Sequence, residues 1–269
     1  MTATNVTVAP VQFDFGRVIT RTLGVFGRNF PVFLFLAAID VVPSAFLLWI
    51  WIKSILPGID RVSVSSALLS SLPLLILAAV VSVVLDSLFQ AAISFGAIVA
   101  LSGKSASVGR CLSASFHSML PLIAIGFVLI VGVVFGLVLL IVPGIILATM
   151  WRVAIPVRVV ERTSIGDSFR RSAELTCGHR WAIFGLGVIF GLAGGAVGYA
   201  LRRILALSLI PMVHHGVLAF APIEIFWIGD SVLRIVTTSI GAVGTASIYY
   251  ELRLIRDGMA PEQVEAVFA

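Results

Sequence analysis

The sequence predicts an all-α membrane protein with six transmembrane helices, arranged as three helical hairpins that each follow a cytoplasmic-side amphipathic helix. Three observations predict this class. The 269 residues are 59% hydrophobic and only 12% charged, whereas soluble domains carry about 25% charged residues. The mean hydropathy is +1.13. Intrinsically disordered chains instead combine low hydrophobicity with high net charge. Six separate stretches are long and apolar enough to cross about 30 Å of hydrocarbon.

These stretches follow one another along nearly the whole chain, so we treat residues 1–269 as one polytopic domain. The predicted spans are 31–53, 72–101, 118–141, 143–160, 181–201 and 229–251. The second span is long enough to tilt or to project from the bilayer. A further apolar segment, 204–228, contains prolines, two histidines and a glutamate. It is interpreted as an outer-surface or re-entrant segment; the alternative is that it merges with the sixth helix.

The distribution of basic residues predicts the orientation. Placing the N-terminus in the cytoplasm puts most of the 18 Lys and Arg residues on the inner side, as the positive-inside rule requires. An even number of spans then leaves both terminal tails, 1–12 and 257–269, in the cytoplasm. We therefore expect a multi-pass protein of the inner (plasma) membrane, with Cys111 and Cys177 as free thiols on its reducing side.

A short amphipathic helix is predicted before spans one, three and five, at 13–30, 105–120 and 164–180. Apolar stripes opposite basic faces are typical of helices at the membrane–water interface. The three repeating units are therefore roughly 13–101, 105–160 and 164–256. Ser164 and Asp167 fit a capping box at the start of the third helix.

The arginines of these helices are expected to face anionic lipid headgroups. They are Arg17, Arg21, Arg110, Arg170 and Arg171. The other interpretation is that the helices only support the hairpins that follow them.

Polar side chains inside the predicted spans are candidate functional groups, because an ionisable group in hydrocarbon is costly unless it is paired or hydrated. They are Asp40, Asp86, Gln90, Arg152, Asp230 and Arg234. Asp86 and Arg152 are expected near mid-depth and form the predicted interhelical pair. Asp230 and Arg234 are four residues apart and can pair within the last span. The alternative is that all of these groups only hold helices together.

Two rows of glycines spaced by four residues predict close helix packing, because small residues let helix backbones approach one another. They are Gly132 and Gly136 in the third span, and Gly187, Gly191 and Gly195 in the fifth. We expect these faces to meet within one chain, and contact between chains is the alternative.

A motif between the fourth and fifth spans carries a family resemblance. It comprises Pro143-Gly144, Arg152, Pro156, Glu161, Ser168-Phe-Arg-Arg-Ser172, Leu175-Thr176 and Gly178, with Tyr249-Tyr-Glu-Leu-Arg253 near the end of the chain. Together these residues resemble the bacterial glycerophosphoryl diester phosphodiesterase membrane-domain family and related inner-membrane proteins. In the namesake enzymes a catalytic barrel, which takes about 250 residues, is fused to such a membrane region. Because membrane segments occupy this chain, the resemblance does not imply phosphodiesterase activity here.

The sequence lacks the motifs GxxxxGK[ST], HExxH, CxxC and GxSxG, which mark several enzyme classes. We predict a non-enzymatic inner-membrane protein, without metal or cofactor, that organises lipids or partner proteins at the cytoplasmic face. Its expected partners are anionic lipid headgroups and, as a second option, another membrane protein, but not nucleic acid. The alternative is a small transporter or lipid-translocating protein with a polar mid-membrane cavity.

Overall fold

The computed structural model describes residues 13–55, 64–214 and 221–258, and these ranges contain helices and short connections without any strand. The helices are α1 (Phe15–Ile55), α2 (Val64–Leu101), α3 (Val108–His117), α4 (Met119–Leu139), α5 (Ile141–Met150), α6 (Ala154–Glu161), α7 (Ile165–Thr176), α8 (Arg180–His214) and α9 (Ala221–Asp257).

Six helical stretches are long and apolar enough to cross a membrane, which confirms the predicted class of multi-pass, all-helical membrane protein. They are Phe15–Ser54, Leu69–Leu101, Met119–Leu139, Ile141–Glu161, Arg180–Ile204 and Trp227–Asp257.

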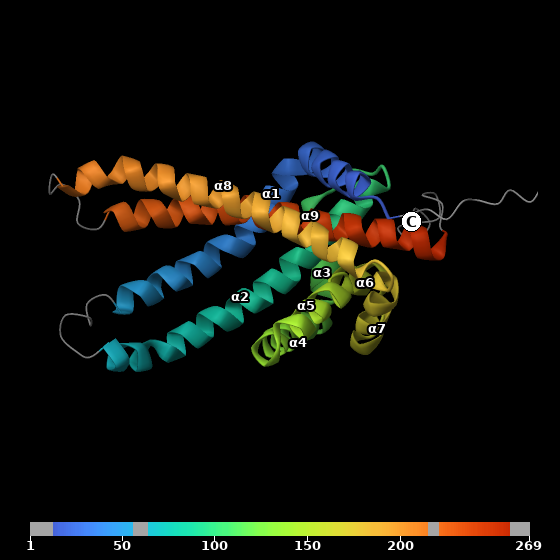
Figure 1. The fold of residues 1–269 in the computed structure, drawn as a ribbon, viewed down its shortest axis with the longest axis horizontal. Helices are drawn as coiled ribbons and strands as arrows, with labels where there is room; N and C mark the ends of the chain where they lie inside the picture. Colours follow the sequence, from blue (N-terminus) through green and yellow to red (C-terminus); the bar gives the residue numbers. More distant parts are fainter. Residues whose placement is uncertain (1–12, 56–63, 215–220, 259–269) are drawn as a thin grey trace, which may run out of the picture.

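The packed centre of the molecule lies where α1, α2 and α9 meet, since each of these helices contacts the other two. Its largest fully buried side chains include Phe33 from α1, Ile93 from α2 and Tyr249 from α9. Helix α8 packs along α9, and α4 packs on α5 after a bend at Leu140. Figure 1 shows α6, α7 and the last turns of α9 at one end of the bundle, which we call the α7 end. From the α7 end, the α8–α9 pair extends far toward the opposite end of the molecule.

Helices α2 and α8 are longer than a bilayer requires. At 1.5 Å per residue, the 35 residues of α8 and the 38 of α2 extend about 53 and 57 Å, against about 30 Å of hydrocarbon. These helices must therefore tilt or project from the membrane, as the sequence predicts for the second span.

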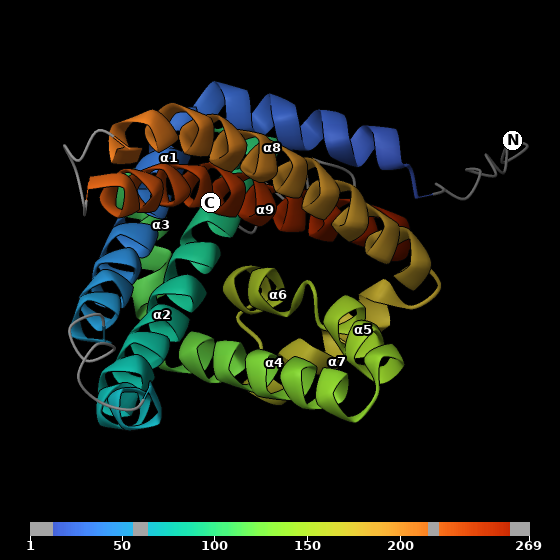
Figure 2. The same ribbon diagram turned by 60° about the vertical axis from the view of Figure 1, so that its left-hand side comes forward.

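Helix α1 consists of two helices that run in different directions (Figure 2), separated by a non-helical residue at Asn29. The cause lies at Pro31, whose ring lacks an N–H donor and clashes with the carbonyl of the residue four positions earlier. The first helix coincides with the predicted amphipathic segment 13–30. Its protein-facing side is formed by Val18, Thr22 and Val25, while the apolar side chain of Leu23 is exposed.

The fourth predicted span, 143–160, is interrupted. Helix α5 ends at Met150 and α6 begins at Ala154, with a turn between them. Pro156 explains the position of the turn. In a continuous helix its ring would clash with the backbone carbonyl group of Arg152, four residues earlier. The ten residues of α5 extend only about 15 Å, so α5 alone is too short to cross the bilayer.

The part of 204–228 that the structure describes forms no re-entrant path, and the outer-surface interpretation of this segment stays a prediction. Helix α8 continues to His214 and α9 begins at Ala221, so these residues lengthen two long helices. The alternative, continuity with the last helix, fits residues 221–228. His215 lies outside the described residues.

The two glycine rows differ in their surroundings. A Cβ atom at Gly132 would lie 2.6 Å from the Trp151 ring, and one at Gly136 would lie 2.9 Å from Gly144 Cα. This row therefore packs within the chain, as the sequence predicts.

The second row does not pack within the described part of the chain. A Cβ at Gly187, Gly191 or Gly195 would meet no atom within 4 Å. The rotation of α8 instead turns Gly194 and Gly198 toward Thr237 and Leu233 of α9, so the expected contact is made by neighbouring positions.

We predict opposite effects of alanine in the two rows. Gly136→Ala should lower the free energy of unfolding in detergent by about 1–3 kcal/mol, because the new methyl group meets backbone that cannot give way. Gly191→Ala should be neutral or stabilising by up to about 1 kcal/mol, since the position is open and alanine favours helix. Equal destabilisation of both variants would contradict this packing.

Candidate functional site

A polar cavity of about 320 Å³ lies beside the turn between α5 and α6, with walls from α2, α4, α6 and α9. Three of the six predicted intramembrane polar residues line it: Asp86, Gln90 and Arg152. Thr238 and Thr245 of α9 add two hydroxyl groups. The interruption of the fourth apolar segment and the cluster of intramembrane polar groups therefore coincide in space.

Helix α7 satisfies the backbone at the interruption. The hydroxyl groups of Ser172 and Thr176 donate hydrogen bonds of 2.8 and 3.3 Å to the carbonyl oxygen of Met150, at the end of α5. The rings of Trp151 and Phe169 pack with their centroids 4.9 Å apart. Non-helical backbone within a membrane persists only where protein or a water-filled cavity covers it. Helix α7 covers the interruption on one side, and the polar cavity lies beside it.

Asp86 and Arg152 face the same cavity but form no ion pair among the described residues. The guanidinium group of Arg152 also makes no hydrogen bond to any described residue, and its side chain is exposed. The predicted direct pair is therefore not made. The cavity instead carries the Asp86 side chain, which interacts with Asp40, and a guanidinium group without an ion-pair partner among the described residues.

Asp40 of α1 does not line the cavity but is a neighbour of Asp86, which does. It is 1% exposed, and its carboxyl group interacts directly with that of Asp86. Its charged neighbours are Asp86 and Arg234. The predicted residues Asp40, Asp86, Arg152 and Arg234 therefore form one connected polar region between α1, α2, α9 and the helix interruption.

Asp230 does not line the cavity and has a different partner from the predicted one. Its Oδ1 atom accepts a hydrogen bond of 3.1 Å from Nε of Arg202, on α8. The structure shows no ion pair between Asp230 and Arg234 among the described residues. Helix α8 packs against α9, and this brings Arg202 close to Asp230. Residue spacing along a single helix does not reveal such a partner on another helix.

A network of ion pairs joins α1 to the last turns of α9 at the α7 end. Glu251 is fully buried, and its two oxygens pair with Arg17, at 2.7 Å, and with Arg21. The guanidinium group of Arg21 also lies over the Tyr250 ring, 5.2 Å from its centroid. The first helix of α1 is thus fixed against α9.

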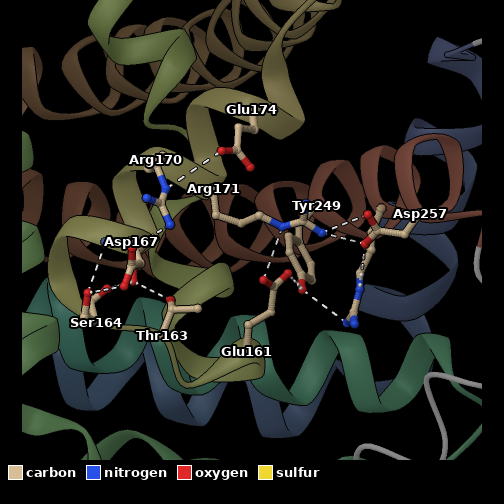
Figure 3. Close-up of polar contacts among 11 residues, drawn as sticks. Glu161, Thr163, Ser164, Asp167, Arg170, Arg171, Glu174, Tyr249 and Asp257 are labelled. Atoms are coloured by element: carbon tan, nitrogen blue, oxygen red, sulfur yellow. Dashed lines mark hydrogen bonds and ion pairs between the residues drawn. The ribbon is translucent and has the colours of Figure 1, made fainter.

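The second part of the network joins α6, α7 and α9 (Figure 3). Arg171 pairs with Asp257 at 2.6 Å and with Glu161 at 3.3 Å, and the Tyr249 hydroxyl donates a 2.8 Å hydrogen bond to Glu161. Burial acts to lower the pKa of Arg171, but the hydrogen bond to Asp257 and the charges of Glu161 and Asp257 outweigh it and raise the pKa. Arg171 is therefore held as a cation between two carboxylates.

The N-cap half of the capping box predicted at the start of α7 is confirmed, while the Asp167 carboxylate bonds to the Ser164 hydroxyl group and not to its backbone N–H. The Ser164 side chain accepts a hydrogen bond from the backbone N–H of Asp167, and its hydroxyl donates to the Asp167 carboxylate at 2.7 Å. Asp167 also pairs with Arg170 at 2.9 Å (Figure 3).

These contacts divide the five arginines expected to face lipid. Arg17, Arg21 and Arg171 pair with carboxylates of other helices. Arg170 keeps 72% of its side chain exposed, and Arg110 is exposed without an ion pair among the described residues. Sequence analysis missed the carboxylate partners, although Glu161 and Glu251 belong to the motifs that carry the family resemblance.

Neither cysteine forms a disulfide in the described chain, as the sequence predicts. Cys111 is buried, and burial raises the pKa of its thiol to about 11. Cys177 is exposed. Within the described ranges, no group of three or more His, Cys, Asp and Glu side chains is placed to hold a metal ion.

Comparison with known proteins found no matching family model, no matching curated protein and no matching solved structure. The resemblance to the glycerophosphoryl diester phosphodiesterase membrane-domain family stays a prediction from sequence.

We predict that Glu251 stabilises the fold. Glu251→Gln should lower the free energy of unfolding by about 3 kcal/mol or more, because it leaves two arginines without their buried counter-charge. Glu174→Gln is the matched control and should cost less than about 1 kcal/mol, since its ion pair is 3.9 Å long and half exposed. Similar unfolding midpoints in detergent for the two variants would show that the network does not hold α1 on α9.

Proposed function

We propose that this chain is a non-enzymatic membrane transport protein that moves the polar headgroup of a zwitterionic lipid across the inner membrane. The observation that supports this most is the cavity beside the helix interruption, where Asp86 and Arg152 bring opposite charges to one space without pairing to each other. Charged groups inside membrane segments are candidate functional sites by default.

The size and the opening of the cavity favour a headgroup. Binding sites for small molecules have volumes of about 300–1,000 Å³, and this cavity measures about 320 Å³. The cavity is only partly enclosed, and Arg152 is an exposed residue of its lining. A headgroup enters through this opening while its acyl chains stay in the hydrocarbon.

The chemistry of the lining matches a phosphate joined to an amine. The guanidinium group of Arg152 suits a phosphate, which it binds through paired N–H donors. The carboxylate of Asp86 suits an ammonium group, and Gln90, Thr238 and Thr245 supply neutral hydrogen-bonding groups. Interrupted helices at substrate sites recur in membrane transporters.

The proposal includes the orientation predicted from the basic residues, with both termini in the cytoplasm. It also keeps the three units of one interfacial helix and two spans. Helix α3 before α4, α7 before α8, and the first helix of α1 support the units. In this orientation the α7 end faces the cytoplasm.

Organisation of lipids or partner proteins at the cytoplasmic face is the second proposal. It is favoured by the exposure of Arg170 and Arg110. The internal ion pairs of Arg17, Arg21 and Arg171 make it the weaker of the two, because those side chains already have counter-charges.

Reconstitution tests the transport proposal. Liposomes that contain the protein and a chain-labelled fluorescent phosphatidylcholine should lose inner-leaflet fluorescence to external dithionite faster than protein-free liposomes. Arg152→Gln should slow this exchange about tenfold or more, since it removes a charge-assisted contact to phosphate. Arg170→Gln, which lies outside the cavity, should exchange at the wild-type rate. Exchange no faster than in protein-free liposomes, or full exchange in Arg152→Gln, would contradict the proposal.

Thiol labelling tests the orientation. A membrane-impermeant maleimide should modify Cys177 only after cells are permeabilised, because that exposed thiol is expected in the cytoplasm. Cys111 should stay unmodified in the folded protein even then, since it is buried and its pKa is about 11. Modification of Cys177 in intact cells would reverse the proposed topology.

A further inference from the structure

A second polar cavity, of about 360 Å³, shares no residue with the first. It lies between α3, the start of α4 and the end of α6. Its polar lining consists of Arg110, Ser113, His117, Ser118 and Arg162, and Phe95, Ala114 and Val159 complete it.

The charge of this cavity is positive without internal compensation. Its lining includes no carboxylate, and the sequence has no Asp or Glu between Asp86 and Glu161. Glu161, the acid nearest in sequence to Arg162, has its two oxygens engaged by Tyr249 and Arg171. Arginine stays protonated in proteins, so Arg110 and Arg162 present two fixed positive charges to one space.

The backbone at Arg162 has an energetically unfavourable conformation. Arg162 is the only non-glycine residue with a positive φ in the described ranges, at 51°, a conformation that favours glycine or asparagine. Arg158 holds the turn by donating to the carbonyl oxygen of Thr163, and the hydroxyl groups of Thr163 and Ser168 lie 2.8 Å apart. Unfavourable backbone conformations of this kind cluster at functional sites.

The remaining polar groups complement the arginines. Arg110, Ser113 and His117 lie three and four residues apart and therefore share one face of α3, while Ser118 connects α3 to α4. Two guanidinium groups with nearby hydroxyl groups and an imidazole form a donor set that matches phosphate oxygens.

We propose that this cavity binds a phosphate group, as a free phosphate or as the headgroup of an anionic lipid. The inference stands independently of the transport proposal, because it uses none of the residues of the first cavity. In the proposed orientation the phosphate site lies on the cytoplasmic side.

Two probes distinguish the sources. The purified full-length protein in neutral detergent is titrated with inorganic phosphate or with dioctanoyl phosphatidic acid, at ionic strength held constant with sodium chloride. Binding of inorganic phosphate supports a soluble anion as ligand, and binding of phosphatidic acid alone supports a lipid headgroup. Binding of neither probe overturns the inference.

Three variants locate the site. Arg110→Gln and Arg162→Gly should each weaken binding of the active probe about tenfold or more, because each removes one charge-assisted contact. Arg162→Gly should also keep or raise the unfolding midpoint, since glycine adopts a positive φ without strain. Loss of binding in this variant is therefore separable from loss of folding. Arg170→Gln, an exposed arginine on α7, should bind as the wild type does.

The inference fails if Arg110→Gln and Arg162→Gly bind with wild-type affinity. It fails equally if Arg152→Gln abolishes binding while those two variants retain it, since the phosphate would then occupy the first cavity.

Discussion

Hydrocarbon supplies neither hydrogen bonds nor counter-charges, so every polar group in the apolar segments of this chain needs a partner within the protein or a hydrated cavity. The interruption between α5 and α6 meets this constraint in two ways. Hydroxyl groups from α7 bind the carbonyl oxygen of Met150 on one side. On the other, Arg152 lies in a cavity with Asp86 and Gln90. Without the cavity, an unpaired guanidinium group at this position would be costly.

Burial within the protein imposes a similar requirement on the charges at the α7 end. Glu251 is fully buried on α9, and it is compensated by two arginines from the first helix of α1. Arg171 links α7 to α6 and to the end of α9 through two further carboxylates. The short helices α6 and α7 are thus fixed to α9 by ion pairs as well as by their buried apolar side chains. The fixed position of α7 in turn supports the helix interruption and the cavity beside it.

Hydropathy predicted the membrane segments well, because the ability to cross hydrocarbon depends on composition over a short window. Partners across helices could not be predicted, because they depend on how each helix is rotated and placed. Asp230 pairs with Arg202 of a neighbouring helix rather than within its own, and Gly194 rather than Gly195 faces α9. The sequence does contain a signal for the helix interruption, because Pro156 lies four residues after Arg152. Hydropathy does not detect this proline effect.

The central claim is that a water-filled polar cavity exists within the membrane region, and cysteine accessibility tests it most directly. In a background of Cys111→Ala and Cys177→Ser, a water-soluble methanethiosulfonate reagent should modify Thr238→Cys, which lines the cavity. It should not modify Phe127→Cys. Phe127 follows the cavity-lining Gly126 on α4, but its side chain is 61% exposed on the surface of the helix bundle. We expect reaction at Thr238→Cys alone, because thiolates form in water and not in hydrocarbon. Equal reactivity at both positions, or none at Thr238→Cys, would contradict it.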